Sequence, residues 1–215
     1  MSGHEVIHLK YDGKLAVITL DNASKFNSLT QASYRRLATL LREADANEDV
    51  VVTLLIGEGP FFSAPPAALI SHSDFIYSVP DAYVLTPFSS LELVAEGGAS
   101  VAFVQRMGWG KANEALILGR KIPVQELVQV GFVNKLFQDK AKFRQQVLEH
   151  VQATFGDHVV GSSMLGTKAL LRRRLVHEQD EAAPLETFGG LDRFCEGIPQ
   201  TEMAKVASGS KKHRL

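Results

Sequence analysis

Two patterns of apolar and polar residues divide the chain. Near the N-terminus, the segments EVIHLKYDG and KLAVITLD alternate apolar and polar positions around Asp12 and Gly13, which predicts a β-hairpin. Between Gln31 and Ala44 the apolar residues recur at helical spacing, which predicts an amphipathic helix. The continuous apolar run VVVTLLIGEG, residues 50–59, predicts a buried strand, and DFIYSV and AYVLTPF predict two further short strands.

Beyond Gly97 the apolar pattern becomes helical. It predicts helices at residues 99–107, 111–118, 124–130, 140–155, 162–174 and 184–196, with a short strand in the segment VNKLF. Strands that come early and helices that come late predict an α/β layer packed against a helical C-terminal region. We expect residues 1–137 to form the α/β core, 138–205 a helical extension and 206–215 a flexible tail.

Composition and charge narrow the class of protein. The 215 residues are 45% hydrophobic, which is normal for a globular core, and no repeat divides them. Twenty-three Lys and Arg against 24 Asp and Glu give a net charge of -1 without a basic, aromatic stripe, which disfavours nucleic-acid binding. The single Cys195 forms no internal disulfide, and no apolar signal or membrane-spanning segment is present. We therefore expect an intracellular protein without a membrane span.

The last residues of the chain resemble a targeting signal. The sequence SGSKKHRL ends in His213, Arg214 and Leu215, which resemble a variant of the peroxisomal tripeptide signal that ends in Ser-Lys-Leu. We expect these three residues to bind the peroxisomal import receptor, which places the protein in the peroxisome. An ordinary basic tail is the alternative.

One acidic residue, Glu96, stands between the apolar residues LVA and the pair Gly97-Gly98, directly before a predicted helix. An acid–base catalyst needs such an apolar setting, because burial raises the pKa of a carboxyl group toward the working pH. The glycines allow backbone and substrate to approach closely. The alternative is that Glu96 only complements the positive end of the following helix. Glu92, four residues earlier, is a second acid and is expected to face elsewhere.

Several motifs, in order, resemble the crotonase (enoyl-CoA hydratase/isomerase) superfamily. ITLDNASKFNSLT is similar to its opening strand and turn, and VVVTLLIGEGPFFSA to its next strand and the loop that presents the first oxyanion-hole amide. The stretch from DFIYSV to VNKLF resembles the second half, so that the match covers most of residues 18–137. The nearest resemblance is to peroxisomal Δ3,Δ2-enoyl-CoA isomerases. It implies an α/β fold with a shortened crotonase-like (ClpP/crotonase) spiral core and a helical C-terminal region.

The resemblance also implies an activity and its residues. Such an enzyme moves a 3-enoyl-CoA double bond to the 2 position, in fatty-acid β-oxidation or a specialised acyl-CoA pathway. Glu96 matches the family's isomerase glutamate, and Ala64 matches the position of the first oxyanion amide. The substrate-binding residues are expected to be Phe62, Ser63, Gly97 and Phe132. Coenzyme A enters as part of the substrate, no other cofactor or metal is implied, and the chain is expected to form a homo-oligomer or a mixed oligomer with relatives.

The resemblance is interrupted after Ala64. There the family continues with a Gly-Ala-Asp type turn, an acyl-binding stretch and the second oxyanion amide, whereas this chain passes through Pro65 and Pro66 into AALISHSD. The core is therefore expected to be incomplete between residues 64 and 68. Proline has no N–H to donate, and the loss of one oxyanion donor costs on the order of 10²–10³ in rate. A non-catalytic relative that binds acyl-CoA or an oligomer partner is the alternative.

Other chemistry is disfavoured by the residues present. The two glutamates of the family's hydratases, which are lyases, align near Ala68 and Phe88, so an isomerase is preferred to a hydratase. The segment SHSD, residues 71–74, contains hydrolase and metal-binding side chains, but neighbouring residues of a strand point to opposite faces and no further ligand completes a shell. The basic segment KALLRRR, residues 168–174, predicts a solvated helix face, with a contact to CoA phosphates as the alternative.

Overall fold

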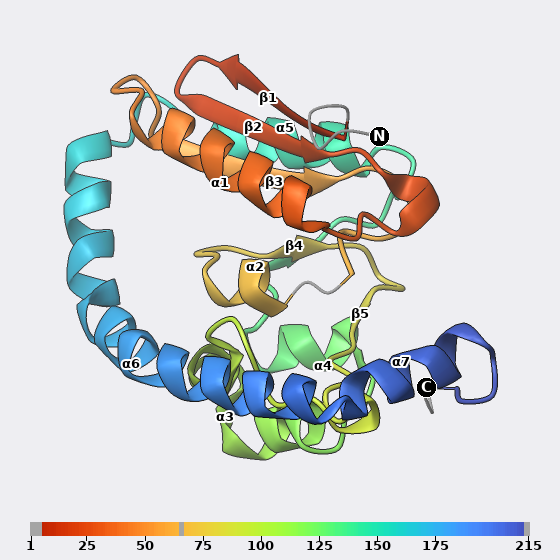
Figure 1. Ribbon diagram of the computed structural model, residues 1–215. Helices are drawn as coiled ribbons and strands as arrows, with labels where there is room; N and C mark the ends of the chain where they lie inside the picture. The colour runs from red at the N-terminus through yellow and green to blue at the C-terminus, as the bar shows by residue number, and fades with distance from the viewer. Residues whose placement is uncertain (1–5, 65–66, 213–215) are drawn as a thin grey trace. The chain divides into compact units, whose positions relative to one another are not determined.

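The computed structural model describes residues 6–64 and 67–212 (Figure 1). The chain forms two compact units, and each combines an early with a late segment. Unit 1 comprises Met1–Pro66 and Arg144–Ala169, and unit 2 comprises Ala67–Phe143 and Leu170–Leu215. The units are defined by contacts between residues and not by continuous segments of sequence. The domain limits expected at 137/138 and 205/206 therefore stay predictions. None of the described helices has the length and apolar character needed to cross a membrane.

Unit 1 is built on a three-stranded sheet. Strands β1 (Ile7–Asp12) and β2 (Leu15–Leu20) form the expected antiparallel hairpin, and Gly13 provides the left-handed turn residue with φ of +56°. Strand β3 (Val52–Gly57) pairs in parallel with β2. The parallel pairing requires a crossover, which the predicted helix α1 (Gln31–Asp45) provides.

The burial of the strands follows from their order in this sheet, β1-β2-β3. Every residue of β2 is buried, because this strand lies at the centre. In β3, Ile56 is the one buried residue. The strand predicted within residues 50–59 is therefore confirmed, but its burial is wrong: β3 is an edge strand, and an apolar run alone does not distinguish an edge from a centre.

Helices cover the sheet of unit 1. Thr30 caps α1 by accepting a hydrogen bond from the N–H of Ser33 at 3.2 Å, and the helix buries Leu37, Leu40 and Ala44. Helix α5 (Phe143–Thr154) buries Val147 and Val151. Figure 1 shows α1 in front of the sheet and α5 behind it.

Unit 2 contains short strand pairs and several helices. The three expected strands are confirmed only as two-residue elements, β4 (Tyr77–Ser78), β5 (Tyr83–Val84) and β7 (Lys135–Leu136). Strand β4 pairs with β7, and β5 pairs with β6 (Ile122–Pro123), which the sequence pattern did not predict. Pro80 and Pro87, which follow β4 and β5, cannot donate to a ladder, which limits their length. Two helices here are α2 (Ala67–Ser71), which the sequence pattern did not predict, and α4 (Val124–Gln129), which it did.

The core of unit 2 centres on two aromatic rings. Phe103 and Phe132 are both fully buried, and their ring centroids lie 5.3 Å apart in an edge-to-face arrangement. Phe103 belongs to α3 (Ala99–Leu116), which joins the helices expected at 99–107 and 111–118 across a kink at Gly108. This core supports the start of α3.

The C-terminal helices differ from the expectation. The helices predicted at 162–174 and 184–196 form one 36-residue helix, α6 (Gly161–Glu196), that continues through Pro184. Proline removes one backbone hydrogen bond but does not end a helix whose other contacts hold it. Helix α7 (Ile198–Ala207), which begins after Gly197, was not predicted as a separate element.

The core of unit 2 yields a stability prediction. Phe103→Ala is expected to lower the free energy of unfolding by about 3–5 kcal/mol, because it leaves a cavity beside Phe132. Trp109→Ala, on the same helix, serves as the control: Trp109 is 73% exposed, so the change is expected to stay within about 0.5 kcal/mol. Urea unfolding followed by circular dichroism measures both, and equal losses would contradict the assignment of the core.

Candidate functional site

The turn that carries Glu96 depends on two glycines in the left-handed conformation. Gly97 and Gly98 have φ of +67° and +79°, and Gly98 is the N-cap of α3. A Cβ atom on Gly97 would lie 2.5 Å from the Cβ atom of Ala68 in α2. The turn therefore needs glycine at position 97 both for its backbone conformation and for the close approach to α2.

The carboxylate that binds the start of α3 belongs to Glu186 of α6. The N–H of Gly98 donates to Oε2 of Glu186 at 2.8 Å, and the N–H of Ser100 donates to Oε1 at 3.0 Å. The hydroxyl of Ser100 also donates to Oε1. Glu186 is only 8% exposed. The alternative role considered for Glu96, to complement the positive end of this helix, is therefore filled by Glu186.

Glu96 itself accepts no side-chain hydrogen bond from the described part of the chain. Glu96 is an exposed residue, so the buried apolar setting expected from the sequence is wrong. The protein around it still partly desolvates the carboxyl group. This desolvation raises the pKa of Glu96, and the negative charge of Glu186 raises it further. Glu96 is thus a solvent-accessible carboxyl group with a pKa above its ordinary value, which suits proton transfer.

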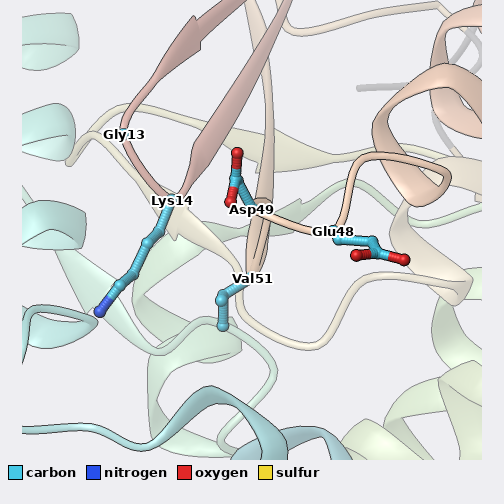
Figure 2. Close-up of a pocket in the computed structure, with 5 residues that line it drawn as sticks. All are labelled: Gly13, Lys14, Glu48, Asp49 and Val51. Atoms are coloured by element: carbon cyan, nitrogen blue, oxygen red, sulfur yellow. The ribbon is translucent and has the colours of Figure 1, made fainter.

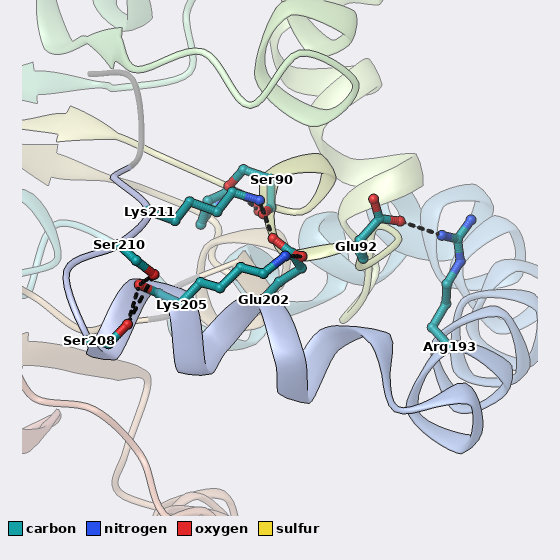
Figure 3. Close-up of polar contacts among 9 residues, drawn as sticks. Ser90, Glu92, Arg193, Glu202, Lys205, Ser208, Ser210 and Lys211 are labelled. Atoms are coloured by element: carbon teal, nitrogen blue, oxygen red, sulfur yellow. Dashed lines mark hydrogen bonds and ion pairs between the residues drawn. The ribbon is translucent and has the colours of Figure 1, made fainter.

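Glu92 is held in an ion pair. Its backbone is left-handed, with φ of +56°, a conformation that favours glycine. Its carboxylate lies 3.0 Å from Nη1 of Arg193 in α6 (Figure 3). Figure 3 also shows the chain after α7, where Lys211 contacts the carbonyl of Ser90 and pairs with Glu202 at 2.5 Å. The segment before Glu96 is therefore held by charges from α6 and from the chain after α7.

In unit 1, the side chain of Asn27 organises the loop that precedes Ala64. Asn27 is 1% exposed, and its Nδ2 donates to the carbonyls of Glu58 at 2.8 Å and Phe61 at 2.7 Å. Its Oδ1 accepts from the N–H of Asn22 at 2.7 Å. One buried amide thereby joins the turn after β2 to the loop after β3.

The predicted residues of this loop have different surroundings. Ser63 is buried and donates from its hydroxyl to the carbonyl of Asn27 at 2.9 Å, so its side chain serves the loop. Phe62 and Ala64 are exposed. Pro65 and Pro66 lie outside the described residues, as do His213, Arg214 and Leu215. Phe62, Ser63 and Ala64 are therefore the predicted residues of this loop that the structure describes.

The remaining predicted residues lie in unit 2. Phe132 packs against Phe103 in the core, so the structure shows a packing role, and a contact with substrate stays a prediction. Ala68 contacts Gly97, and Phe88 is buried in the same core. Neither of the two positions aligned with hydratase glutamates therefore provides an acid.

The segment SHSD has structural contacts. The hydroxyl of Ser71 donates to the carbonyl of Ala67 at 2.8 Å, and Arg172 pairs with Asp74 at 2.8 Å. Nη2 of Arg172 also donates to the carbonyl of His72 at 2.7 Å. Within the described ranges, no group of three or more His, Cys, Asp and Glu side chains is arranged to hold a metal ion. Ser71 ends α2 and residues 72–74 follow it, so the segment does not lie on a strand as expected, and its described contacts are structural.

Two surface hollows contain none of the residues predicted for catalysis or acyl binding. The one in unit 1 lies beside the β1–β2 turn, and Figure 2 shows its lining residues: Gly13, Lys14, Glu48, Asp49 and Val51. Lys14 is engaged there with Asp157 at 3.0 Å. The other hollow lies along α6 and is lined by Leu170, Arg173, Arg174 and His177. Three of these residues belong to the basic segment 168–174, for which a contact with the phosphates of CoA stays a prediction.

Sequence reasoning missed Glu186 and Asn27. A sequence signal for Glu186 exists, because Arg172, Gln179, Glu186 and Arg193 recur at intervals of seven and so share one side of a helix. Because two separate helices were expected at 162–174 and 184–196, Gln179 lay outside both and the repeat was not recognised. Asn27 has no comparable signal, since its hydrogen bonds reach residues more than thirty positions away.

Comparison with known proteins gives full-length matches. No protein-family model matches the chain. The sequence is 38% identical to Delta(3,5)-Delta(2,4)-dienoyl-CoA isomerase of Pyricularia oryzae, over all of both chains. It is 24% identical to 3,2-trans-enoyl-CoA isomerase of Saccharomyces cerevisiae, over 99% of this chain and 98% of the relative. The first alignment runs over 282 positions although this chain has 215 residues, so that relative has several tens of residues without a counterpart here.

Solved structures show the same fold at low identity. An enoyl-CoA hydratase/isomerase from Pseudoalteromonas atlantica matches 98% of this chain and 100% of its own, with a TM-score of 0.88 and 16% identity. Enoyl-CoA hydratase from Mycobacterium tuberculosis matches 89% of this chain and 99% of its own, with a TM-score of 0.80 and 17% identity. At these identities the likeness extends to the fold alone.

The buried amide of Asn27 can be tested by substitution. Asn27→Ala is expected to lower the free energy of unfolding by about 2–4 kcal/mol, because it leaves three partly buried backbone groups without this partner. The control is Asn47→Ala, which removes one hydrogen bond, to the N–H of Asp49, and is expected to cost no more than about 1 kcal/mol. Chemical unfolding measures both, and a loss for Asn27→Ala no larger than for the control would contradict this role.

The glycine turn can be tested with a matched pair. Gly97→Ala and Gly131→Ala both place a side chain at positive φ, which costs about 1–2 kcal/mol. At Gly131 no atom lies within 4 Å of the new Cβ, whereas at Gly97 it meets Ala68, which adds about 1–3 kcal/mol. Thermal and urea unfolding of the two variants should therefore differ by that addition. Equal destabilisation would mean that the turn is not packed against α2.

Proposed function

Because this chain belongs to the crotonase superfamily of enoyl-CoA hydratases and isomerases, we propose that it moves the double bond of a 3-enoyl-CoA to the 2 position through Glu96. The α/β crotonase-like fold with a helical C-terminal region is confirmed by the solved structures, and the enzyme family by the full-length relatives. The acyl-CoA substrate brings its own coenzyme A, and the proposed mechanism requires no other cofactor.

The proposed reaction is a proton shuttle. The ionised carboxylate of Glu96 takes a proton from C2 of the substrate, and the electron pair of that C–H bond spreads through the resulting dienolate onto the thioester oxygen. The same carboxyl group then returns the proton at C4, so the double bond moves from C3–C4 to C2–C3 and no atom is gained or lost. We assign the N–H of Ala64 as a donor to the thioester oxygen, and Phe62, Ser63, Gly97 and Phe132 as substrate-binding residues.

The observation that best supports the proposal is the raised pKa and solvent access of the Glu96 carboxyl group. A helix-start carboxylate would be engaged with backbone N–H groups, and at α3 that engagement belongs to Glu186. Glu96 instead combines a raised pKa with access to solvent and no side-chain hydrogen bond within the described chain. A carboxyl group in this state accepts and returns a proton more readily than one that is tied to donors.

The 38% identity to a dienoyl-CoA isomerase favours a second substrate, a 3,5-dienoyl-CoA. Conversion to the 2,4-diene removes a proton from C2 and adds one at C6, so the returning proton must reach further than in the 3-enoyl reaction. Assays with both substrates distinguish these candidates. Hydration is disfavoured, because Ala68 and Phe88 occupy the positions aligned with the hydratase glutamates.

A non-catalytic role is supported by the several tens of residues that the full-length relative has in addition. In that case the chain binds acyl-CoA or joins an oligomer of relatives without turnover. For either role we propose a peroxisomal location, with His213, Arg214 and Leu215 bound by the import receptor.

The central test is Glu96→Gln. This variant is expected to lower kcat/KM for isomerisation of a 3-enoyl-CoA by about 10²–10⁴-fold, because Gln cannot accept the C2 proton. In the wild type, kcat/KM should fall as the pH falls through the raised pKa of Glu96, since the protonated acid is no base. Appearance of the conjugated 2-enoyl product is followed by absorbance. Glu181→Gln, which changes an exposed carboxylate of α6, is the control and should retain activity.

The same pKa shift has a consequence for stability. A carboxyl group whose folded pKa is raised binds protons more tightly in the native state, so its contribution to stability falls as the pH rises through the interval between the unfolded and folded pKa values. Glu96→Gln should therefore unfold no more readily than the wild type at neutral pH. Undiminished turnover in Glu96→Gln would refute the mechanism, and a wild type that binds acyl-CoA without turnover would favour the non-catalytic role.

A further inference from the structure

Helix α6 presents a polar stripe to the segments around Glu96. Its residues, at intervals of seven and so nearly two helical turns apart, are Arg172, Gln179, Glu186 and Arg193. Arg172 pairs with Asp74 after α2, and Arg193 pairs with Glu92 before the glycine turn. The stripe therefore contacts the chain on both sides of Glu96, at Asp74 and at Glu92, within unit 2.

The middle of the stripe is its buried part. Gln179 and Glu186 are 7% and 8% exposed, and they are the buried residues of α6 among those described. A helix that buries polar side chains gains little from hydrophobic contact, because buried polar groups cost free energy unless they are hydrogen-bonded. At the start of α3, the hydrogen bonds to Glu186 offset this cost.

The glycine turn fits closely against this stripe. A Cβ atom on Gly98 would lie 3.0 Å from Nε2 of Gln179 and 3.6 Å from Nε2 of His72. Two successive glycines at positive φ have wide backbone freedom when unrestrained. In this structure the restraint comes from Glu186, which binds the N–H groups of Gly98 and Ser100 and the hydroxyl of Ser100.

We propose that Glu186 is a positioning residue for the reaction assigned to Glu96, because its carboxylate fixes the Gly98 and Ser100 amides and thereby the direction of the Glu96 side chain. This inference rests on the proposed function. Glu186 does not touch substrate in this role. It holds the backbone two to four residues beyond the base, and a misplacement of a reacting group by about 1 Å can cost about 10²-fold in rate.

The charges around Glu186 support a second effect. His72 follows α2, Arg172 lies on α6 and Glu96 lies on the turn; the charge of Arg172 is shared with Asp74. Desolvation and then Arg172 lower the pKa of His72, whereas Glu186 raises it. After desolvation, Glu186 is also the cause that raises the pKa of Glu96. Removal of this negative charge should therefore favour the ionised form of Glu96 and lower its pKa.

Three variants separate positioning from stability. Glu186→Ala removes the carboxylate, and Glu186→Gln removes the charge at nearly constant size while it sets an NH2 group against a backbone N–H. The control is Glu181→Gln on the same helix, where the exposed carboxylate pairs only with His177 at 3.3 Å among the contacts described. If Glu186→Ala does not fold, Glu186→Gln still decides the outcome.

Each variant is studied by three measurements. Isomerisation of a 3-enoyl-CoA gives kcat and KM, hydrogen exchange gives the protection of the Gly98 and Ser100 amides, and NMR of labelled glutamate gives the titration of the Glu96 carboxyl group. Both Glu186 variants should lower kcat by about 10–100-fold with little change in KM, and should lose amide protection. In Glu186→Gln, the titration of Glu96 and the acid limb of kcat/KM should both move to lower pH. Glu181→Gln should match the wild type.

The proposal is overturned if Glu186→Gln leaves the Glu96 titration and the protection of both amides as in the wild type, whatever the activity. It is also overturned if stability falls while kcat and the pH profile stay unchanged, because a purely structural cap acts in that way. A wild type without turnover contradicts the proposed function instead. The titration and exchange measurements then still decide whether Glu186 controls the turn.

Discussion

The contact between the Glu186 carboxylate and the start of α3 is the constraint on which the glycine turn after Glu96 depends. A buried carboxylate needs donors, and the first N–H groups of a helix need acceptors, so each satisfies the other. The two donor residues, Gly98 at the N-cap and Ser100 in the first turn of α3, lie two and four residues after Glu96. The same contact therefore fixes α6 against α3 and places the candidate base.

The carboxyl groups of Glu186 and Glu96 therefore have different surroundings and different roles. Glu186 is engaged by three donors from the turn, whereas Glu96 has a raised pKa and reaches solvent. When the surroundings of two acids differ in this way, the engaged group serves structure and the other is available for proton transfer. Glu92, a third acid nearby, is engaged with Arg193 and follows the first pattern.

In unit 1, a buried polar side chain likewise binds backbone groups of a loop. The buried side chain of Asn27 donates to the carbonyls of Glu58 and Phe61, and the backbone carbonyl of Asn27 accepts from the hydroxyl of Ser63. The loop that leads to Ala64 is thus fixed by a polar side chain that lies far from it in sequence. In both units, a buried polar residue provides hydrogen bonds to a segment that has no regular secondary structure to satisfy its backbone groups.

The sequence by itself determined the hairpin, α1, the position of Glu96 before a glycine turn and the family, because these depend on local periodicity, turn residues and ordered motifs. Only the tertiary structure decided that residues 161–196 form one helix through Pro184, that β3 lies at an edge, and that Glu186 caps α3. Each of these depends on contacts between residues far apart in the chain. Local patterns do not contain such contacts, since the partner of a buried polar group is chosen by the fold.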